Sequence, residues 1–119
     1  MKIRTLSLLS LLAFAACSAK SPIAGNWTRE GGPEGEKYIL EFENGGTRVV
    51  GHIDDADGHR HIEPSPTYTF DAATMAVTVD GKLLGADGPA KWTGKLDGDH
   101  LELGAADTKL TFHKGGKAH

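Results

Sequence analysis

Three histidines flank one turn-forming segment, Asp55-Ala56-Asp57-Gly58: His52 precedes it, and His59 and His61 follow it. If this segment forms a hairpin loop, His52 lies opposite His61 and Asp54 lies opposite His59, and all four side chains share one face. Imidazole nitrogens and a carboxylate about 5 Å apart across a strand pair can bind Zn²⁺, Cu²⁺ or Ni²⁺ with one coordination position left open. The sequence thus indicates a divalent-metal site, with Zn or Cu as its cofactor.

A solvated polar hairpin accounts for the same residues, so metal binding is kept as the alternative function. Metal binding through imidazoles predicts that the metal affinity falls as the pH drops below about 6.5, because protonated imidazoles do not bind metal. Because His59 and His61 are expected to point outward, replacing both by Ala should leave the fold nearly unchanged.

Two tyrosines and two tryptophans fall in the inward phase of the predicted strands, where they could line a small apolar cavity with a polar handle. These candidate ligand-binding residues are Trp27, Tyr38, Tyr68 and Trp92. Gly25, Gly51 and Gly94 fall on the same face and would leave space. A packed core without a ligand is the other interpretation, because the interior of an eight-stranded barrel is just wide enough for side chains to fill.

Apolar residues alternate with polar ones along most of the chain after residue 22, which predicts β-strands. Turn signals such as Asn44-Gly45-Gly46, Asp80-Gly81 and Asp97-Gly98 separate the runs. Tight hairpins between seven or eight short strands give an antiparallel meander, which removes its free edges by closing. Pro64-Ser65-Pro66 cannot lie in a central strand and marks a corner or break. The expected fold is therefore all-β, a small antiparallel up-and-down β-barrel. Its expected interior comprises Ile23, Trp27, Tyr38, Leu40, Phe42, Val49, Ile53, Ile62, Tyr68, Phe70, Met75, Val77, Val79, Trp92, Leu96, Leu101, Leu103, Leu110 and Phe112.

Composition excludes several function classes. A chain of 119 residues allows one domain, and a formal charge of −3 gives no electrostatic footprint for nucleic acid. The one cysteine excludes an internal disulfide scaffold and a multi-cysteine metal site. Because the chain has no Gly-x-Ser-x-Gly elbow and no phosphate loop, and no acid–base pair falls on the inner face, we expect a protein that is not an enzyme.

The first residues have the order of a signal peptide. Lys2 and Arg4 precede an apolar run, and the run ends in Leu12-Ala13-Phe14-Ala15-Ala16-Cys17-Ser18. This ending resembles the lipobox of bacterial lipoproteins, in which the cysteine is diacylated and becomes the new N-terminus. The resemblance implies a diacylglycerol and an acyl chain on Cys17, and Ser18 resembles lipoproteins sorted to the outer membrane of Gram-negative bacteria. A secreted protein cut after Ala13-Phe14-Ala15 is the alternative.

The segment Gly25-Asn26-Trp27 resembles the Gly-x-Trp that opens lipocalin-like barrels, and residues 92–103 are similar to the late hairpin of short bacterial lipocalin-like domains. The resemblance implies a small hydrophobic ligand, or an envelope protein as partner. The expected organisation is a signal peptide over 1–16, a lipidated tether over 17–22, a barrel over 23–114 and a flexible tail over 115–119. The expected location is the cell envelope, held to the membrane by lipid and, in a Gram-negative host, on the outer membrane facing the periplasm.

Overall fold

The computed structural model describes residues 21–117. The predicted signal peptide and the lipidation site Cys17 lie outside the described residues. Within residues 21–117, no helix is long and apolar enough to cross a lipid bilayer. The described chain forms an antiparallel sheet in the order β4-β3-β2-β1-β9-β8-β7-β6-β5. The strands are β1 (Gly25–Glu30), β2 (Lys37–Phe42), β3 (Val49–Asp55), β4 (Gly58–His61), β5 (Thr67–Asp71), β6 (Ala76–Asp80), β7 (Lys91–Asp97), β8 (His100–Ala105) and β9 (Thr108–Lys114).

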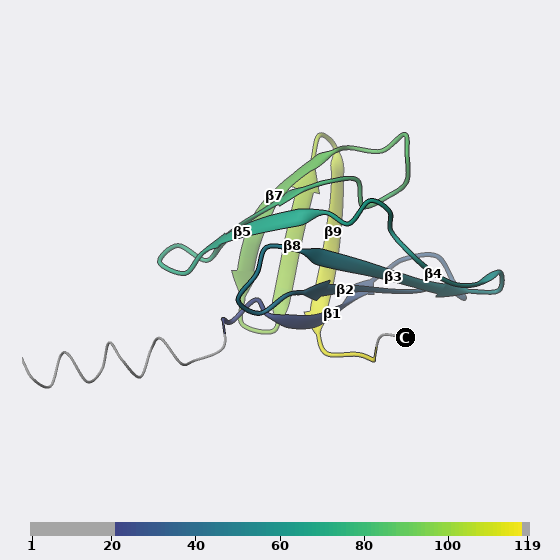
Figure 1. The fold of residues 1–119 in the computed structure, drawn as a ribbon, viewed down its shortest axis with the longest axis horizontal. Coiled ribbons are helices and arrows are strands. Elements are labelled where there is room, and N and C mark those ends of the chain that lie inside the picture. Colours follow the sequence, from purple (N-terminus) through teal and green to yellow (C-terminus); the bar gives the residue numbers. More distant parts are fainter. Residues whose placement is uncertain (1–20, 118–119) are drawn as a thin grey trace, which may run out of the picture.

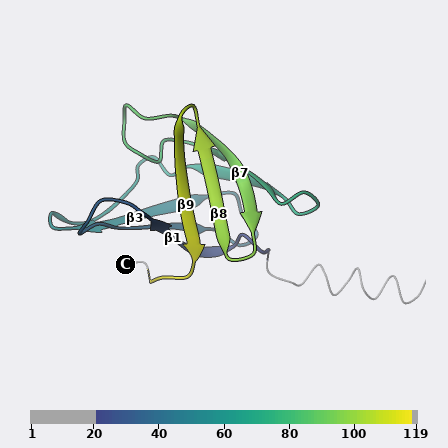
Figure 2. The same ribbon diagram turned by 180° about the vertical axis from the view of Figure 1, so that it is seen from behind.

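The sheet curls into a small up-and-down β-barrel, which confirms the predicted fold class. β1, β2 and β3 form one wall, β5 and β7 lie across from them, and β8 and β9 cross between the two walls (Figure 1). Seen from behind, β7, β8 and β9 lie side by side (Figure 2). Following the strands around the barrel is the same as following the chain, because β1 pairs with β9 and every other pairing joins consecutive strands.

β4 and β5 are the two edge strands of the sheet, and within residues 21–117 the sheet closes at one corner, between the start of β3 and the start of β5. Arg48 and Thr67 form an antiparallel bridge there, the Val49 N–H donates to the Pro66 carbonyl at 2.8 Å, and the Tyr68 N–H donates to the Thr47 carbonyl. Beyond this corner β4 and β5 separate, and residues 62–66 connect them without forming a strand. Pro64-Ser65-Pro66 therefore marks a break between strands, as predicted from the two prolines.

Apolar side chains from all walls fill the barrel. Its buried core is Ile23, Trp27, Tyr38, Leu40, Phe42, Val49, Tyr68, Val77, Val79, Leu83, Trp92, Leu96, Leu101, Leu103, Leu110 and Phe112, with Ile53, Ile62 and Phe70 packed against it. The prediction that Met75 lies in the interior is wrong. Met75 is 38% exposed, and its φ of 63° places it in the turn before β6 rather than in the strand. Leu83, in the connection from β6 to β7, was not predicted and is fully buried.

Residues 21–117 form nine strands, where the alternation predicted seven or eight. All four residues of β4, Gly58–His61, are exposed. This strand therefore has no hydrophobic alternation, and it was expected only from the turn at Asp55–Gly58 and the hairpin register that follows from it.

The start of β1 and the residues that follow β9 lie next to each other and are joined by hydrogen bonds. The Gly115 N–H donates to the Asn26 carbonyl at 2.8 Å, the Asn26 side chain donates to the Gly116 carbonyl, and the Thr28 hydroxyl donates to the Gly115 carbonyl. The first two residues of the predicted tail, Gly115 and Gly116, are thus hydrogen-bonded to β1.

Candidate functional sites: a histidine cluster and a cleft

The β3–β4 hairpin brings the three histidines together in the predicted register. His52 pairs with His61, Ile53 with Arg60 and Asp54 with His59. The turn is held by Asp55, whose carboxylate accepts the Asp57 N–H at 2.9 Å and forms an ion pair with Arg60 at 3.1 Å. A side-chain acceptor for a backbone N–H two residues on is the usual Asx device for a tight turn. The turn therefore fixes the register that aligns His52, His59 and His61.

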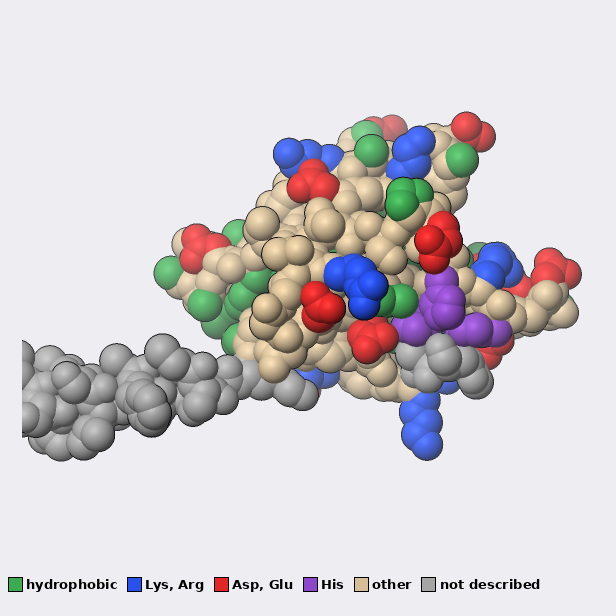
Figure 3. Space-filling view, in the orientation of Figure 1, with side chains coloured by type: hydrophobic (Ala, Val, Ile, Leu, Met, Phe, Trp, Pro, Cys, Tyr) green, Lys and Arg blue, Asp and Glu red, His purple; other side chains and the backbone are tan. Residues whose placement is uncertain are grey.

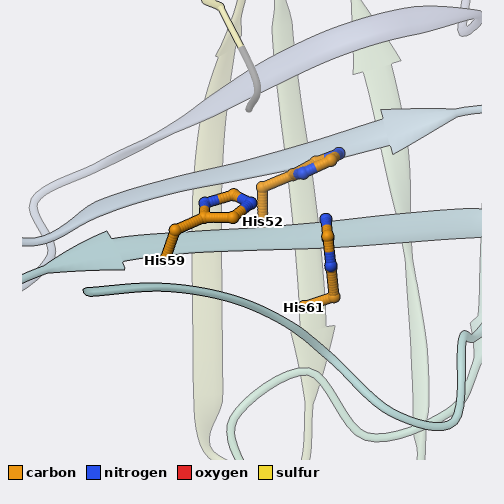
Figure 4. Close-up of side chains that lie close together, drawn as sticks. All are labelled: His52, His59 and His61. Carbon is orange, nitrogen blue, oxygen red and sulfur yellow. The ribbon is translucent and has the colours of Figure 1, made fainter. Parts of the chain in front are cut away.

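The three imidazoles form one cluster on the outer face of the barrel. One ligand atom from each of His52, His59 and His61 lies within 4.8 Å of the others. The ring centroids are 4.8 Å apart for His52 and His61 and 4.9 Å apart for His59 and His61. Figure 4 shows His59 and His61 each turning a ring nitrogen toward His52. Over the same hairpin, histidine side chains form a surface patch beside acidic and basic groups (Figure 3).

His52 differs from its two partners because it is buried. It is 7% exposed, whereas His59 and His61 are exposed. Its Nε2 lies 2.9 Å from Glu41 Oε1, and its Nδ1 is buried with no hydrogen-bond partner among the described residues. Since a carboxylate only accepts hydrogen bonds, the Nε2 of His52 carries the proton, and in the neutral ring Nδ1 presents a free lone pair. Burial and Glu41 together hold this ring in one orientation.

Asp54, the fourth residue of the predicted metal site, lies opposite His59 in the strand register. The group of converging ligand atoms contains the three histidines and does not include Asp54. The described structure therefore brings three of the four predicted ligands together.

A second feature is a cleft of about 930 Å³ at the end of the barrel where β4 and β5 separate. Residues 62–65 form one side, and the β6–β7 connection from Asp80 to Ala86 forms the other. Tyr38, Ile53, Ile62 and Leu83 give the cleft an apolar lining. Charged side chains lie around it, among them Arg29 and Glu36, whose side chains form an ion pair at 3.9 Å. The cleft is an apolar recess with a charged rim.

Tyr38 connects the cleft to the loop that covers its inner side. Its hydroxyl donates a hydrogen bond to the Leu83 carbonyl, and its ring lies 6.0 Å from the ring of Phe112. Burial raises the pKa of Tyr38 far above the ordinary tyrosine value, and the nearby Arg29 guanidinium opposes this shift only in part. The neutral hydroxyl therefore stays available to hold the loop.

The other three predicted ligand-binding residues lie in the packed core and do not line the cleft. Trp27 is fully buried and its indole N–H donates to the Ile23 carbonyl at 2.9 Å. The Tyr68 hydroxyl donates to the Glu43 carbonyl at 2.5 Å. Trp92 is fully buried, and its Nε1 has no hydrogen-bond partner among the described residues.

Two of the three inward glycines do not leave an internal space. A Cβ on Gly51 would lie 2.3 Å from the Cδ1 of Ile62, so the Ile62 side chain occupies that position. A Cβ on Gly94 would lie 1.6 Å from the Glu102 carbonyl oxygen, so the backbone of β8 occupies that one. The expectation that Gly51 and Gly94 leave interior space is wrong, whereas a Cβ on Gly25 would meet nothing within 4 Å.

We expect Tyr38→Phe to change how stability depends on pH. The folded pKa of Tyr38 lies above that of the unfolded chain, so the unfolded state loses this proton first as the pH rises above about 10. The wild type should therefore lose up to about 1.4 kcal/mol of unfolding free energy per pH unit from this group, and the variant should lose this component. Urea unfolding between about pH 8 and 11 measures both slopes.

Tyr68→Phe is the comparison variant: burial also raises the pKa of Tyr68, so this variant should lose a slope component of its own, but its hydroxyl bonds to the Glu43 carbonyl outside the cleft. At neutral pH, Tyr38→Phe should itself cost about 1–3 kcal/mol, since the Leu83 carbonyl loses its donor. Equal slopes for Tyr38→Phe and the wild type would contradict the assignment.

Comparison of the chain with protein-family models, with curated proteins and with solved structures gives no significant match.

Several residues of these sites were not predicted, among them Glu41, Arg29 and Leu83. Glu41, the partner of His52, lies in the outward phase of β2, and only the β2–β3 register, which pairs Ile39 with His52, brings it close. Arg29 reaches the cleft from the C-terminal end of β1, and Leu83 reaches it from the β6–β7 loop. Hydrophobic alternation gives no signal for either position. A predicted strand register across the Asn44-Gly45-Gly46 turn would have placed Glu41 near His52. Arg29 and Leu83 have no local sequence signal.

Proposed function

We propose that this protein is a non-enzymatic, lipid-anchored protein of the cell envelope whose barrel holds a small molecule in the cleft. The observation that carries the proposal is the size and lining of the cleft. Its volume of about 930 Å³ lies within the range of about 300–1,000 Å³ typical of small-molecule sites. Tyr38, Ile53, Ile62 and Leu83 suit an apolar body, and the charged rim suits a polar end group. The proposed ligand is an amphipathic molecule of a few hundred daltons, roughly the size such a site encloses.

The direction of the chain supports the anchored arrangement. β1 begins at Gly25, opposite Phe42, and its far end carries Arg29, which lines the cleft. The described residues that lead into β1, 21–24, therefore lie at the end of the barrel away from the cleft. A lipid on Cys17 would leave the cleft facing solution, where a ligand can reach it. The resemblance of residues 12–18 to a lipobox supplies the anchor in this proposal.

Native mass spectrometry of the full chain, purified in mild detergent without added ligand, tests the proposal. We expect a non-covalent adduct of a few hundred daltons and a covalent acyl mass on Cys17. Ala90→Trp should reduce the adduct by about tenfold or more, equivalent to about 1.4 kcal/mol of binding, because Ala90 is exposed and lines the cleft.

The control is Ala72→Trp, which adds the same ring at an exposed position in the β5–β6 turn, outside the cleft. A protein without an adduct would contradict the small-molecule proposal and direct the search to a protein partner in the envelope. An adduct that survives Ala90→Trp would place the ligand elsewhere. A missing acyl mass would contradict the anchor while leaving the cleft proposal in place.

A further inference from the structure

We propose that His52, His59 and His61 form a binding site for one transition-metal ion, Zn²⁺ or Cu²⁺, on the outer face of the barrel. His61 also lines the cleft, but this proposal does not rest on the cleft ligand, since the metal needs no organic molecule to bind. The inference depends on the state of His52 as well as on the convergence of three histidines.

The Nδ1 of His52 is a metal ligand without another role. It is buried and has no hydrogen-bond partner among residues 21–117, although an unsatisfied buried polar atom is costly. A metal ion beside Nδ1 would satisfy its lone pair. Figure 4 shows a ring nitrogen of His59 and one of His61 directed toward His52, the residue whose Nδ1 has no hydrogen-bond partner in the described part of the chain.

Glu41 supplies the support that metal-binding histidines commonly have. The ring nitrogen of a ligand histidine that does not bind the metal usually donates to a carboxylate or carbonyl, which fixes the tautomer and the ring orientation. His52 Nε2 donates to Glu41 Oε1 at 2.9 Å in this way. Glu41 is therefore a positioning residue, and Nδ1 of His52 is the nitrogen assigned to the metal.

The geometry needs only a small closure. Each bond from Zn²⁺ to a histidine nitrogen is about 2.0–2.1 Å, so two nitrogens on one ion lie at most about 4 Å apart. The ligand atoms of the cluster lie within 4.8 Å of one another. His59 and His61 are exposed and can rotate toward the fixed His52. Three imidazoles suit Zn²⁺ and Cu²⁺ and leave a coordination position for water.

Titration calorimetry of the metal-free full chain in mild detergent, with ZnCl₂ and separately with CuCl₂, tests the site. We expect one equivalent of metal per chain for the wild type and loss of this equivalent in His59→Ala/His61→Ala. Glu41→Gln should weaken binding by about 10–100-fold while retaining the stoichiometry. Since His59 and His61 are exposed, the double variant should unfold at the same temperature as the metal-free wild type, and only the wild type should gain stability from metal.

The matched control is His100→Ala/His113→Ala. These two histidines also face each other across a strand pair, and His113 also contacts a carboxylate, Glu30, at 3.1 Å, but they are not part of the three-histidine group. The control should bind one equivalent as the wild type does. Loss of binding in the control, or full binding in His59→Ala/His61→Ala, would overturn the proposal, as would a wild type that binds no metal.

A spectroscopic readout separates the role of Glu41 from a structural one. Long-range ¹H–¹⁵N spectra of the histidine rings should show His52 protonated at Nε2 in the metal-free protein and its Nδ1 resonance shifted on addition of Zn²⁺. In Glu41→Gln the amide can donate as well as accept, so the preference for the Nε2-protonated tautomer should weaken. A wild-type His52 that binds Zn²⁺ through Nε2 would contradict the assigned orientation.

Discussion

Gly94→Ala is expected to lower the free energy of unfolding by about 3 kcal/mol or more, at or above the upper end of the usual cost of overpacking. A Cβ on Gly94 would lie 1.6 Å from the Glu102 carbonyl oxygen and 2.7 Å from its carbon. These are backbone atoms of β8, so no side-chain rotation can relieve the clash. β7 and β8 would have to separate where Gly94 pairs with Leu103. Urea unfolding followed by tryptophan fluorescence measures the loss.

Gly104→Ala is the control for this substitution on the same pair of strands. Gly104 pairs with Thr93, and a Cβ at Gly104 would meet its nearest atom, the Thr108 carbonyl oxygen, at 3.7 Å. This is an ordinary contact, so the control should change stability by less than about 1 kcal/mol, the usual range for Gly to Ala within a strand. Similar losses in the two variants would show that the close approach of β7 and β8 is not the cause.

Trp27→Ala should cost about 3–5 kcal/mol, the usual range for truncating a fully buried aromatic side chain. Trp27 is 0% exposed and lies on β1, which pairs with both β2 and β9. Removing the indole leaves a void in the core and leaves the Ile23 carbonyl without the donor that now lies 2.9 Å away. Thermal and urea unfolding should both show the loss, which is a large part of the stability of a typical domain.

Trp27→Phe distinguishes the two contributions. The phenyl ring keeps much of the apolar volume but cannot donate to the Ile23 carbonyl. We expect an intermediate loss of about 1–3 kcal/mol, the usual cost of leaving a buried acceptor unsatisfied. If Trp27→Phe were as harmful as Trp27→Ala, the hydrogen bond rather than the packing would determine the role of this residue.

Alternation and turn chemistry were enough to predict the barrel and the register of its histidine hairpin. The register followed from keeping Ile62 in phase with Val49, Gly51 and Ile53, and the structure places Asp54 opposite His59 as expected. The period-two pattern works here because one face of nearly every strand is buried, so a shift by one residue would expose it. Where a turn interrupts the strand, the pattern misleads, as at Met75 with its φ of 63°.

The parts of the candidate sites that could not be predicted depend on the folding of the chain in three dimensions. Leu83 lies among glycines and a lysine in a loop, and its burial arises because the loop folds over Tyr38 and accepts its hydroxyl hydrogen bond. His52 likewise has no local signal, because the alternation placed it on the outer face and its hydrogen bond to Glu41 comes from a neighbouring strand. The sequence therefore predicted which histidines meet, but not that one of them is held with a free nitrogen.

The strand order has a consequence for when this barrel can form. Every strand pairing joins strands that are consecutive in the sequence except one, between β1 and β9, in which Trp27 lies opposite Lys114. Hairpins between neighbours close short loops and form early, whereas a pairing across nearly the whole chain is reached late because its loop-closure entropy is larger. Since β9 is also the last of the described strands to be synthesised, β1 keeps an unpaired edge until the ribosome has made the residues of β9.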